Sequence, residues 1–414
     1  MFADKVQRLA YFSYLSLSIM LKKYSFAYTL KYALFLFIGT VLFASCAKNN
    51  EDLPAPQYFI SATPLGEISK ANVDRRLGAN PLVSSLTKYA FKAYRIVYKT
   101  KDLDNNEIQA SGAVLIPITS EKLAIASYQH GTIRSDSEAP SNFAENSEAG
   151  LLGSLIASIG YVVSMPDYLG YGASKQIPHP YEHRKSLATA SIDMLRAVKE
   201  FCRIEKVNLN DRLFLTGYSE GGFATMSMQK MMEEEFASEF KITASVLGAG
   251  AYNKTAFSKY VAAQNTNLTF INYYVWVLQT YNNVYKLNRP LSAFFTEPNA
   301  TNIQQRGVFT NIDLNPQQLF TPSFRNGIIN GTDVEFLNTL KDNDVFDWRP
   351  KTPMLLVHGK DDDFVIPLNS QTAYNAMQAR GATNVELLLV DGDHYSAVPN
   401  YALQVYSFFF RYNN

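Results

Sequence analysis

Ser219 stands where an apolar run gives way to small residues and then to a stretch suited to a helix, in "LFLTGYSEGGFATM". Glycines flank it at 217 and 221, and a third follows at 222. A tight turn alone would need such small residues. The alternative is that Ser219 is a nucleophile held on a strained turn. Such a serine needs a base to remove its proton, a third group to orient the base, and backbone N–H donors for the oxyanion.

The candidate bases are the five histidines of the chain, at positions 130, 179, 183, 358 and 394. His394 lies in "VDGDHYSAV", directly after the apolar run "VELLLV", which predicts a strand. A loop in that position brings its imidazole to the carboxyl edge of a parallel sheet, where the turn holding Ser219 would also lie. His130 is expected to brace its own loop, and His179 and His183 are expected in loops or at the surface without a chemical role.

An acidic run follows the preceding predicted strand, in "LLVHGKDDDFVIP". Asp362 is favoured as the group that orients His394 because it stands four residues after His358. Asp361 and Asp363 remain alternatives, and the run can also be read as a solvated turn or a cation site. The prediction is that Asp362 and His394 meet the serine at one edge of the sheet.

Apolar runs separated by helical patterns predict the sheet that would hold these loops. The expected strands are residues 93–100, 108–117, 123–129, 161–167, 212–217, 242–250, 353–359 and 385–392. The expected helices are residues 148–160, 186–201, 222–236, 370–381 and 401–412. This alternation predicts an α/β fold with a doubly wound, mostly parallel sheet and an antiparallel start.

Residues 253–349 interrupt the alternation after the sixth expected strand and are rich in Asn, Tyr and Phe. They divide the predicted core into residues 58–252 and 350–414. An insertion at this place would form a helical cap or lid over the carboxyl ends of the strands, where open α/β sheets bind ligands. Its stretch 268–285 is apolar on almost every face, which is consistent with packing against the core and with contact to substrate.

Residues 1–45 carry lysines and then the apolar run "YALFLFIGTVLFAS", which is short for a membrane span and suits a signal peptide. The run leads into "FASC", which resembles a bacterial lipobox and implies lipidation at Cys46. An ordinary signal peptide and an uncleaved anchor are alternatives, and Met1 and Met20 are both candidate starts. The polar segment 46–57 is then a tether. The expectation is an exported bacterial lipoprotein, anchored to a membrane by its N-terminal lipid and facing the periplasm or the cell exterior.

The composition is that of a folded globular protein, with 414 residues of which 47% are hydrophobic and 18% charged. The net charge is +1 and no basic block is present, so a nucleic-acid partner is not expected. Cys202 is the only cysteine after Cys46, which leaves no internal disulfide and favours a core residue. No metal site and no catalytic zinc are predicted.

The chain resembles the α/β-hydrolase superfamily in motifs that occur in the family's order. These are "GYSEG" (217–221), which fits G-x-S-x-G, "HGKDDDFVIP" (358–367) and "GDHYSA" (392–397). More closely, "PDYLGYGAS" (166–174), "HPY" (179–181) and "DVFDWRPKTPMLLVHG" (344–359) resemble secreted bacterial lipase-like esterases. The resemblance implies the α/β-hydrolase fold and a catalytic triad in the order Ser219, Asp362, His394.

The oxyanion hole would be formed by two backbone N–H groups. That of Glu220 opens the predicted helix after the serine, where the helix dipole favours negative charge. By resemblance to family members with His-Gly after the third strand, the loop "QHGTI" supplies the second donor, the N–H of Thr132. In "PDYLGYGAS", Asp167 is expected to bond nearby backbone, and a structural loop is favoured over substrate contact by Tyr168 or Tyr171.

The resemblance implies a serine hydrolase that cleaves carboxylic esters, as a lipase or esterase does, through an acyl-enzyme and without a cofactor. Its substrates would be small-molecule, lipid or glycan esters. Two alternatives stay open. One is a serine peptidase of the same fold, because the same triad cleaves amides. The other is a non-catalytic surface lipoprotein that binds glycan or lipid, although such a protein has no need of three triad residues.

Overall fold

The structure, a computed structural model, describes residues 54–78 and 81–413. The predicted signal peptide, the predicted lipidation site Cys46 and most of the predicted tether lie outside the described residues. Every helix and strand described belongs to one contact unit, Pro56–Asn414. In the described part of the chain, no helix is both long and apolar enough to cross a membrane.

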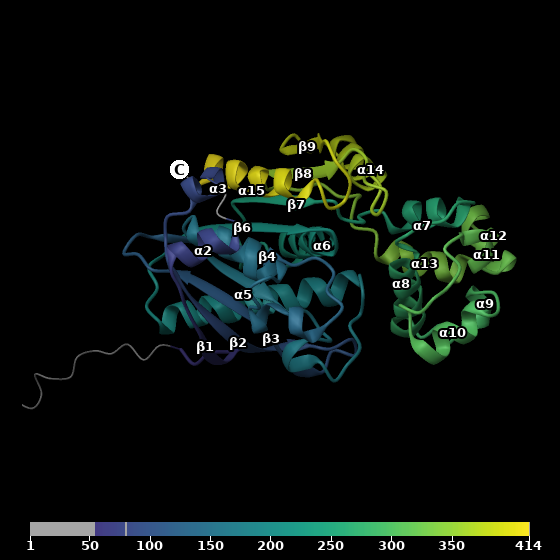
Figure 1. Cartoon of the computed structure of the whole chain (residues 1–414), viewed down its shortest axis with the longest axis horizontal. Helices are drawn as coiled ribbons and strands as arrows, with labels where there is room; N and C mark the ends of the chain where they lie inside the picture. Colours follow the sequence, from purple (N-terminus) through teal and green to yellow (C-terminus); the bar gives the residue numbers. More distant parts are fainter. Residues whose placement is uncertain (1–53, 79–80, 414) are drawn as a thin grey trace, which may run out of the picture. The chain divides into compact units, whose positions relative to one another are not determined.

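Nine strands within the described residues form one sheet, in the order β1-β2-β3-β5-β4-β6-β7-β8-β9 (Figure 1). Their bounds are β1 Phe59–Ile68, β2 Phe91–Lys101, β3 Glu107–Pro117, β4 Leu123–Gln129, β5 Tyr161–Pro166, β6 Leu209–Tyr218, β7 Ala244–Gly248, β8 Met354–Gly359 and β9 Val385–Val390. The first three pairings are antiparallel, and the five from β5 to β9 are parallel. The predicted fold class, a mostly parallel α/β sheet with an antiparallel start, is confirmed.

Burial explains which strands the sequence predicts. β4, β5 and β7 are buried along their whole length, which is why they appear as near-continuous apolar runs. The edge strand β1 is not predicted, because most of its residues are exposed and it contains Pro64 and Gly66. Its pairing with β2 is also shifted between Phe59 and Ser61 and between Pro64 and Gly66. The insertion therefore follows the seventh strand and not the sixth.

Helices cover both faces of this sheet. In chain order, their bounds are α2 Lys70–Arg76, α3 Pro81–Leu86, α4 Ser154–Ser158, α5 Arg184–Ile204, α6 Glu220–Glu235, α14 Leu368–Ala379 and α15 Val398–Tyr412. The helix predicted at 148–160 begins as a π-helical turn, Ala149–Gly153, and continues as the short α4. α4 and α15 share one hydrophobic cluster with the sheet, and α5, α6 and α14 pack on the other side in two further clusters.

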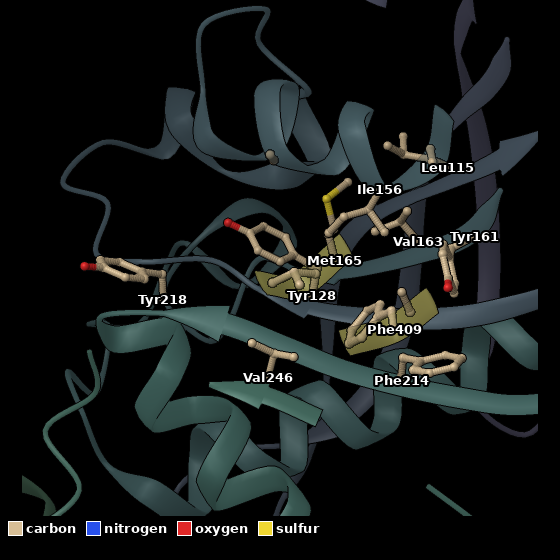
Figure 2. Packing of buried hydrophobic residues seen from close by; sticks show 14 of the residues in the cluster. Leu115, Tyr128, Ile156, Tyr161, Val163, Met165, Phe214, Tyr218, Val246 and Phe409 are labelled. Carbon is tan, nitrogen blue, oxygen red and sulfur yellow. The ribbon is translucent and has the colours of Figure 1, made fainter. Parts of the chain in front are cut away.

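Large side chains fill the space between the helices and the sheet. On the α4 and α15 side, Figure 2 shows Phe214 of β6 beside Phe409 of α15, and the two ring centroids are 4.7 Å apart. On the opposite side, Cys202 of α5 is fully buried in the cluster that α5 forms with β2 and β6. Burial raises the pKa of its thiol to about 12. The prediction that Cys202 is a core residue is confirmed.

The segment between β7 and β8 is helical in the described chain and is drawn in green in Figure 1. Its helices are α7 Lys254–Ala263, α8 Ile271–Val284, α9 Leu291–Phe294, α10 Asn299–Arg306, α11 Pro316–Leu319, α12 Pro322–Asn330 and α13 Val334–Asp342. They bury a hydrophobic cluster in which Phe294, Phe320, Phe324 and Phe336 pack edge to face, and which also includes Tyr181, Ala251 and Val365 from outside the insertion. The exact bounds 253–349 and the action of this insertion as a cap remain predictions.

The aromatic helix α8 packs against residues outside the insertion and borders a cavity at the nucleophile turn, whereas its contact with substrate stays a prediction. Val275, Leu278 and Tyr281 are buried in the cluster of the insertion. Trp276 instead stacks on Tyr181, a residue of the core, with ring centroids 4.3 Å apart. Other residues of α8 line a cavity beside the nucleophile turn. The helix therefore joins the insertion to the core.

Candidate active site

The turn at Ser219 lies between the end of β6 and the start of α6. The serine has φ 59° and ψ −123°, a conformation that L-residues with a side chain avoid. A Cβ atom on Gly221 would lie 2.0 Å from the carbonyl oxygen of Gln129, and one on Gly217 would lie 2.3 Å from that of Gly221. The glycines are thus needed for close packing. A positive φ on a serine rather than a glycine points to a use for its hydroxyl, since strain of this kind gathers at functional sites.

The structure brings Ser219, Asp362 and His394 together. The Oγ atom of Ser219 lies 2.9 Å from Nε2 of His394, and Nδ1 of His394 lies 2.7 Å from Oδ2 of Asp362. His394 and Asp362 are both buried, whereas the alternatives Asp361 and Asp363 are exposed. An ionised Asp362 can only accept hydrogen bonds, so the ring hydrogen of His394 is on Nδ1. Nε2 is then free to accept a hydrogen bond from the hydroxyl of Ser219.

The surroundings of Asp362 keep it ionised. Its Oδ1 atom accepts hydrogen bonds from the backbone N–H groups of Phe364, at 3.0 Å, and Val365, at 2.8 Å. Nε2 of His358 lies 3.3 Å from Oδ2. Burial alone would raise the pKa of Asp362, but hydrogen bonds from His358 and His394 lower it to about 2. The four-residue spacing from His358 thus corresponds to a contact.

The loop of His394 is held from several sides. The hydroxyl of Tyr218 donates to the carbonyl oxygen of His394 at 2.8 Å. The ring of Phe364 stacks on the imidazole, with centroids 4.9 Å apart and 18° between the planes. Asp393 accepts hydrogen bonds from the N–H groups of Tyr395 and Ser396 and so closes the turn. These contacts restrict the imidazole to the orientation in which it meets the serine.

The two predicted oxyanion donors follow β6 and β4, which are paired neighbours. Glu220 is the first residue of α6, so its N–H is among the four that a helix leaves without a partner in its own backbone. The N–H of Thr132 has no hydrogen-bond acceptor in the described part of the chain, and its hydroxyl pairs with that of Tyr181 at 3.0 Å. The preceding N–H, that of Gly131, donates to Glu148. The oxyanion role of Glu220 and Thr132 stays a prediction.

His130 braces the loop that carries Thr132. Its Nδ1 atom lies 2.6 Å from the carbonyl oxygen of Gly131, and its ring stacks on Tyr168 at 4.2 Å. Asp167 accepts a hydrogen bond from the N–H of Ser141 at 2.7 Å, in line with its expected bond to nearby backbone.

Two tyrosines of the neighbouring loop also donate to backbone. The hydroxyl of Tyr168 donates to His130, at 3.0 Å, and that of Tyr171 to Ile133, at 2.7 Å. Neither tyrosine is among the residues that line the cavity at Ser219.

His179 and His183 lie in loops, as one of the two expectations has it, but neither lies at the surface and both have partners. Both are buried. His183 caps the first turn of α5, where its Nδ1 atom accepts from the N–H of Ser186, and burial lowers the pKa of its imidazole to about 4. His179 pairs with Glu220, the residue after the nucleophile. The pairing joins residues 41 positions apart, so no local pattern could indicate it.

A cavity opens beside Ser219 with a volume of about 30 Å³. Its wall combines residues of the core and of the insertion, namely Tyr181, Glu182, Ser219, Ala251, Lys254, Phe257, Ser258, Phe270, Tyr273, Tyr274, Val277, Phe364 and Val365. Glu182 and Lys254 form a buried ion pair in this wall, which the sequence does not indicate because the two lie 72 positions apart. The remaining lining is mainly aromatic and apolar.

The residues described contain no group of three or more His, Cys, Asp or Glu side chains arranged to hold a metal ion. The acidic run at Asp362, for which a cation site is an alternative, instead places its central carboxylate against two histidines. This arrangement can transfer a proton from the hydroxyl of Ser219 to Nε2 of His394, while Asp362 holds Nδ1 of the same ring.

A family model described as secretory lipase matches residues 140–398, more than half of the chain. No curated protein matches the chain in sequence. Among solved structures, a candidate hydrolase from Legionella pneumophila is 29% identical, with a TM-score of 0.79 over 86% of this chain and 99% of its own.

Two further solved structures are similar. A ligand-bound form of the rice cell wall degrading esterase LipA from Xanthomonas oryzae is 26% identical, with a TM-score of 0.71 over 85% of this chain and 95% of its own. Candida antarctica lipase A is 16% identical, with a TM-score of 0.59 over 82% of this chain and 78% of its own, which is a likeness of fold.

Proposed function

The chain belongs to the secretory lipase family, and from this we propose that it is a serine hydrolase that cleaves carboxylic esters through Ser219, His394 and Asp362. The observation that carries the proposal is the pair of contacts on one imidazole. Its Nε2 atom lies 2.9 Å from the serine Oγ and its Nδ1 atom lies 2.7 Å from the carboxylate. These distances are those at which a base removes a proton and a carboxylate orients the base.

In the proposed reaction, the Oγ atom of Ser219 attacks the acyl carbonyl while Nε2 of His394 takes its proton. Asp362 holds the ring and stabilises the imidazolium that forms. The N–H groups of Glu220 and Thr132 bind the oxyanion of the tetrahedral intermediate. His394 then gives its proton to the leaving alcohol, and an acyl-enzyme remains. Water, activated by the same imidazole, attacks the acyl-enzyme, releases the acid and restores the serine.

The cavity beside Ser219 favours short acyl groups. Its volume of about 30 Å³ has room for about two water molecules. Phe257, Phe270 and Tyr274 in its wall are buried side chains, so a long acyl chain that enters this cavity must displace them. Forcing extra methylene groups into a packed site costs about 1–3 kcal/mol. The proposed substrates are therefore small-molecule, lipid or glycan esters with a short acyl group.

A series of p-nitrophenyl esters tests this proposal. We expect hydrolysis of the acetate and butyrate esters, and a kcat/KM value for the palmitate ester that is about 10- to 100-fold lower, as the cost of displacing the aromatic wall requires. Phe257→Ala removes a ring from that wall and is expected to reduce the difference in kcat/KM between the butyrate and palmitate esters. Peptide p-nitroanilides are expected to be poor substrates. Release of p-nitrophenol and p-nitroaniline is measured spectrophotometrically.

Phe324→Ala is the matched control, because this phenylalanine is buried in the same insertion but does not line the cavity. It should lower thermal stability without changing the preference for acyl length. Equal rates for butyrate and palmitate would contradict the short-acyl proposal. Faster cleavage of the anilides would indicate a peptidase, and no cleavage of any substrate would favour a binding protein.

We also propose that Cys46 is lipidated and anchors the exported protein to a membrane. Membership of a secretory family supports export. The expected result is that the wild-type protein fractionates with membranes and Cys46→Ser does not, because the variant has no thiol to accept the lipid. Immunoblots of soluble and membrane fractions measure this. A soluble wild type would indicate an ordinary signal peptide, and a membrane-bound Cys46→Ser would indicate an uncleaved anchor.

A further inference from the structure

His179 and Glu220 form a buried pair at the base of the nucleophile turn. Nε2 of His179 lies 2.8 Å from Oε1 of Glu220, and the two side chains are 3% and 1% exposed. The other ring nitrogen, Nδ1, lies 2.6 Å from the carbonyl oxygen of Leu169. Since Glu220 directly follows Ser219, the pair ties the loop of Leu169 and His179 to the turn that holds the serine.

Both ring nitrogens of His179 face atoms that accept hydrogen bonds. The oxygen of Leu169 is a carbonyl and cannot donate, and an ionised Glu220 cannot donate either. A neutral imidazole has a single N–H group, so it would leave one of these contacts without a hydrogen. Two N–H groups satisfy both contacts. With an ionised Glu220 the arrangement is that of an imidazolium beside a carboxylate, and such a charge-assisted hydrogen bond is stronger than a neutral one.

Aromatic rings surround the imidazole of His179. The ring centroids lie at 4.9 Å for Tyr171, 5.7 Å for Trp276, and 6.1 Å for both Tyr168 and Tyr181. The face of an aromatic ring attracts a cation that lies within about 6 Å of the ring centroid. Trp276 belongs to α8, so the insertion supplies one wall of this cage. The cage is suited to a charged imidazole and keeps water from its pair with Glu220.

A second buried ion pair lies near this one. The ammonium of Lys254 and the carboxylate of Glu182 contact each other, so together they add no net charge. Burial raises the pKa of Glu182, and its contact with Lys254 opposes that effect. Because this second pair adds no net charge, His179 is the basic group that contacts Glu220 directly.

We propose that His179, as an imidazolium, is a positioning residue for the ester hydrolysis proposed above. By holding the side chain of Glu220, it fixes the first turn of α6 and with it the backbone N–H that would bind the oxyanion. The effect on rate follows from geometry, because a displacement of about 1 Å in a catalytic group can lower the rate about 100-fold. Loss of this contact leaves the residues that line the substrate cavity unchanged, so we expect kcat to fall and KM to change little.

Variants of the pair test this in the full-length protein with p-nitrophenyl butyrate. His179→Ala and Glu220→Ala are expected to lower kcat about 10- to 100-fold and to change KM less than about threefold. Glu220→Gln keeps the shape and one hydrogen bond but removes the charge, so a smaller loss, about 3- to 10-fold, is expected. Pre-steady-state bursts should show acylation slowed in parallel with kcat, because the oxyanion forms in both half-reactions.

The charge of His179 is measured separately by ¹⁵N NMR of histidine-labelled protein at neutral pH, with the signals of residue 179 assigned from their loss in His179→Ala. Both ring nitrogens should be protonated in the wild type and only one in Glu220→Gln. His183→Gln is the matched control, because His183 is equally buried but contacts α5 rather than the serine turn. It should lower thermal stability and leave kcat within about twofold, since it forms no part of the proposed reaction.

A kcat in His179→Ala within twofold of the wild type would overturn the positioning role, and so would an equal loss of kcat in His183→Gln. A neutral imidazole at His179 would overturn the assigned charge. If His179→Ala does not fold, Glu220→Gln decides through its kcat and its NMR signals. A wild type that hydrolyses no ester would refute the proposed function instead, and the NMR result would still decide whether the pair is charged.

Discussion

Ser219→Ala is expected to abolish ester hydrolysis, with kcat for p-nitrophenyl butyrate lower by about 10⁴- to 10⁶-fold, because the attacking oxygen is removed. KM should change little, since the hydroxyl is a small part of the cavity wall. A fluorophosphonate probe should label the wild type covalently and leave the variant unlabelled, because it reacts with an activated serine oxygen. Steady-state kinetics and mass spectrometry of the labelled protein measure the two effects.

Ser219→Gly is the informative companion of that variant. It also lacks the oxygen and should be equally inactive. Glycine, however, adopts a positive φ at no steric cost, whereas the serine is held at 59°. Relief of such strain is expected to raise the free energy of unfolding by about 1 kcal/mol. An inactive but more stable variant would indicate that the chain keeps a strained residue here for its hydroxyl.

Retained activity in Ser219→Ala would place the nucleophile elsewhere and refute the proposed function. Labelling of the variant by the probe would have the same consequence. An unchanged stability in Ser219→Gly would leave the nucleophile in place but would show that the backbone of this turn stores no strain. Thermal and urea unfolding of the three proteins, compared at one pH, separate these outcomes.

The sequence predicts the fold well where burial produces a local pattern. β4, Leu123–Gln129, has the predicted bounds because both of its faces are buried. Most of the other predicted strands agree with the structure within a few residues. The same reasoning brings Ser219, Asp362 and His394 together. Each follows the carboxyl end of a parallel strand, and such ends share one edge of the sheet. Chain order and strand position suffice for this, without knowledge of any side-chain contact.

The parts that the sequence does not predict depend on contacts between distant segments. β1 has one neighbour and an exposed face, so its residues show no apolar period. His179 stands in a loop of mixed composition, and only the fold places Glu220 and Trp276 against it. Likewise, the sequence around Glu182 and around Lys254 suggests two separate surface charges, whereas the fold buries them as an ion pair. Tertiary environment, not local pattern, gives these residues their properties.

Asp362→Asn is expected to lower kcat by about 10⁴-fold with little change in KM. An asparagine amide can donate to Nδ1 of His394, which favours the tautomer with hydrogen on Nε2. That nitrogen then cannot accept the proton of Ser219. Asp361→Asn and Asp363→Asn are matched controls, because their carboxylates are exposed neighbours in the same run. They should retain kcat within about twofold, as surface substitutions do.

Acid stability gives an independent test of the same carboxylate. Its pKa of about 2 in the folded protein lies below the ordinary value of 3.8, so Asp362 stabilises the fold above about pH 4 and loses this contribution as the pH falls toward 2. The difference corresponds to about 2 kcal/mol. Asp362→Asn should flatten this part of the stability profile, measured by urea unfolding between pH 2 and 5. A carboxylate orients an imidazole only if the two are in contact. If Asp361→Asn or Asp363→Asn removed activity and Asp362→Asn did not, the substituted aspartate and not Asp362 would orient His394.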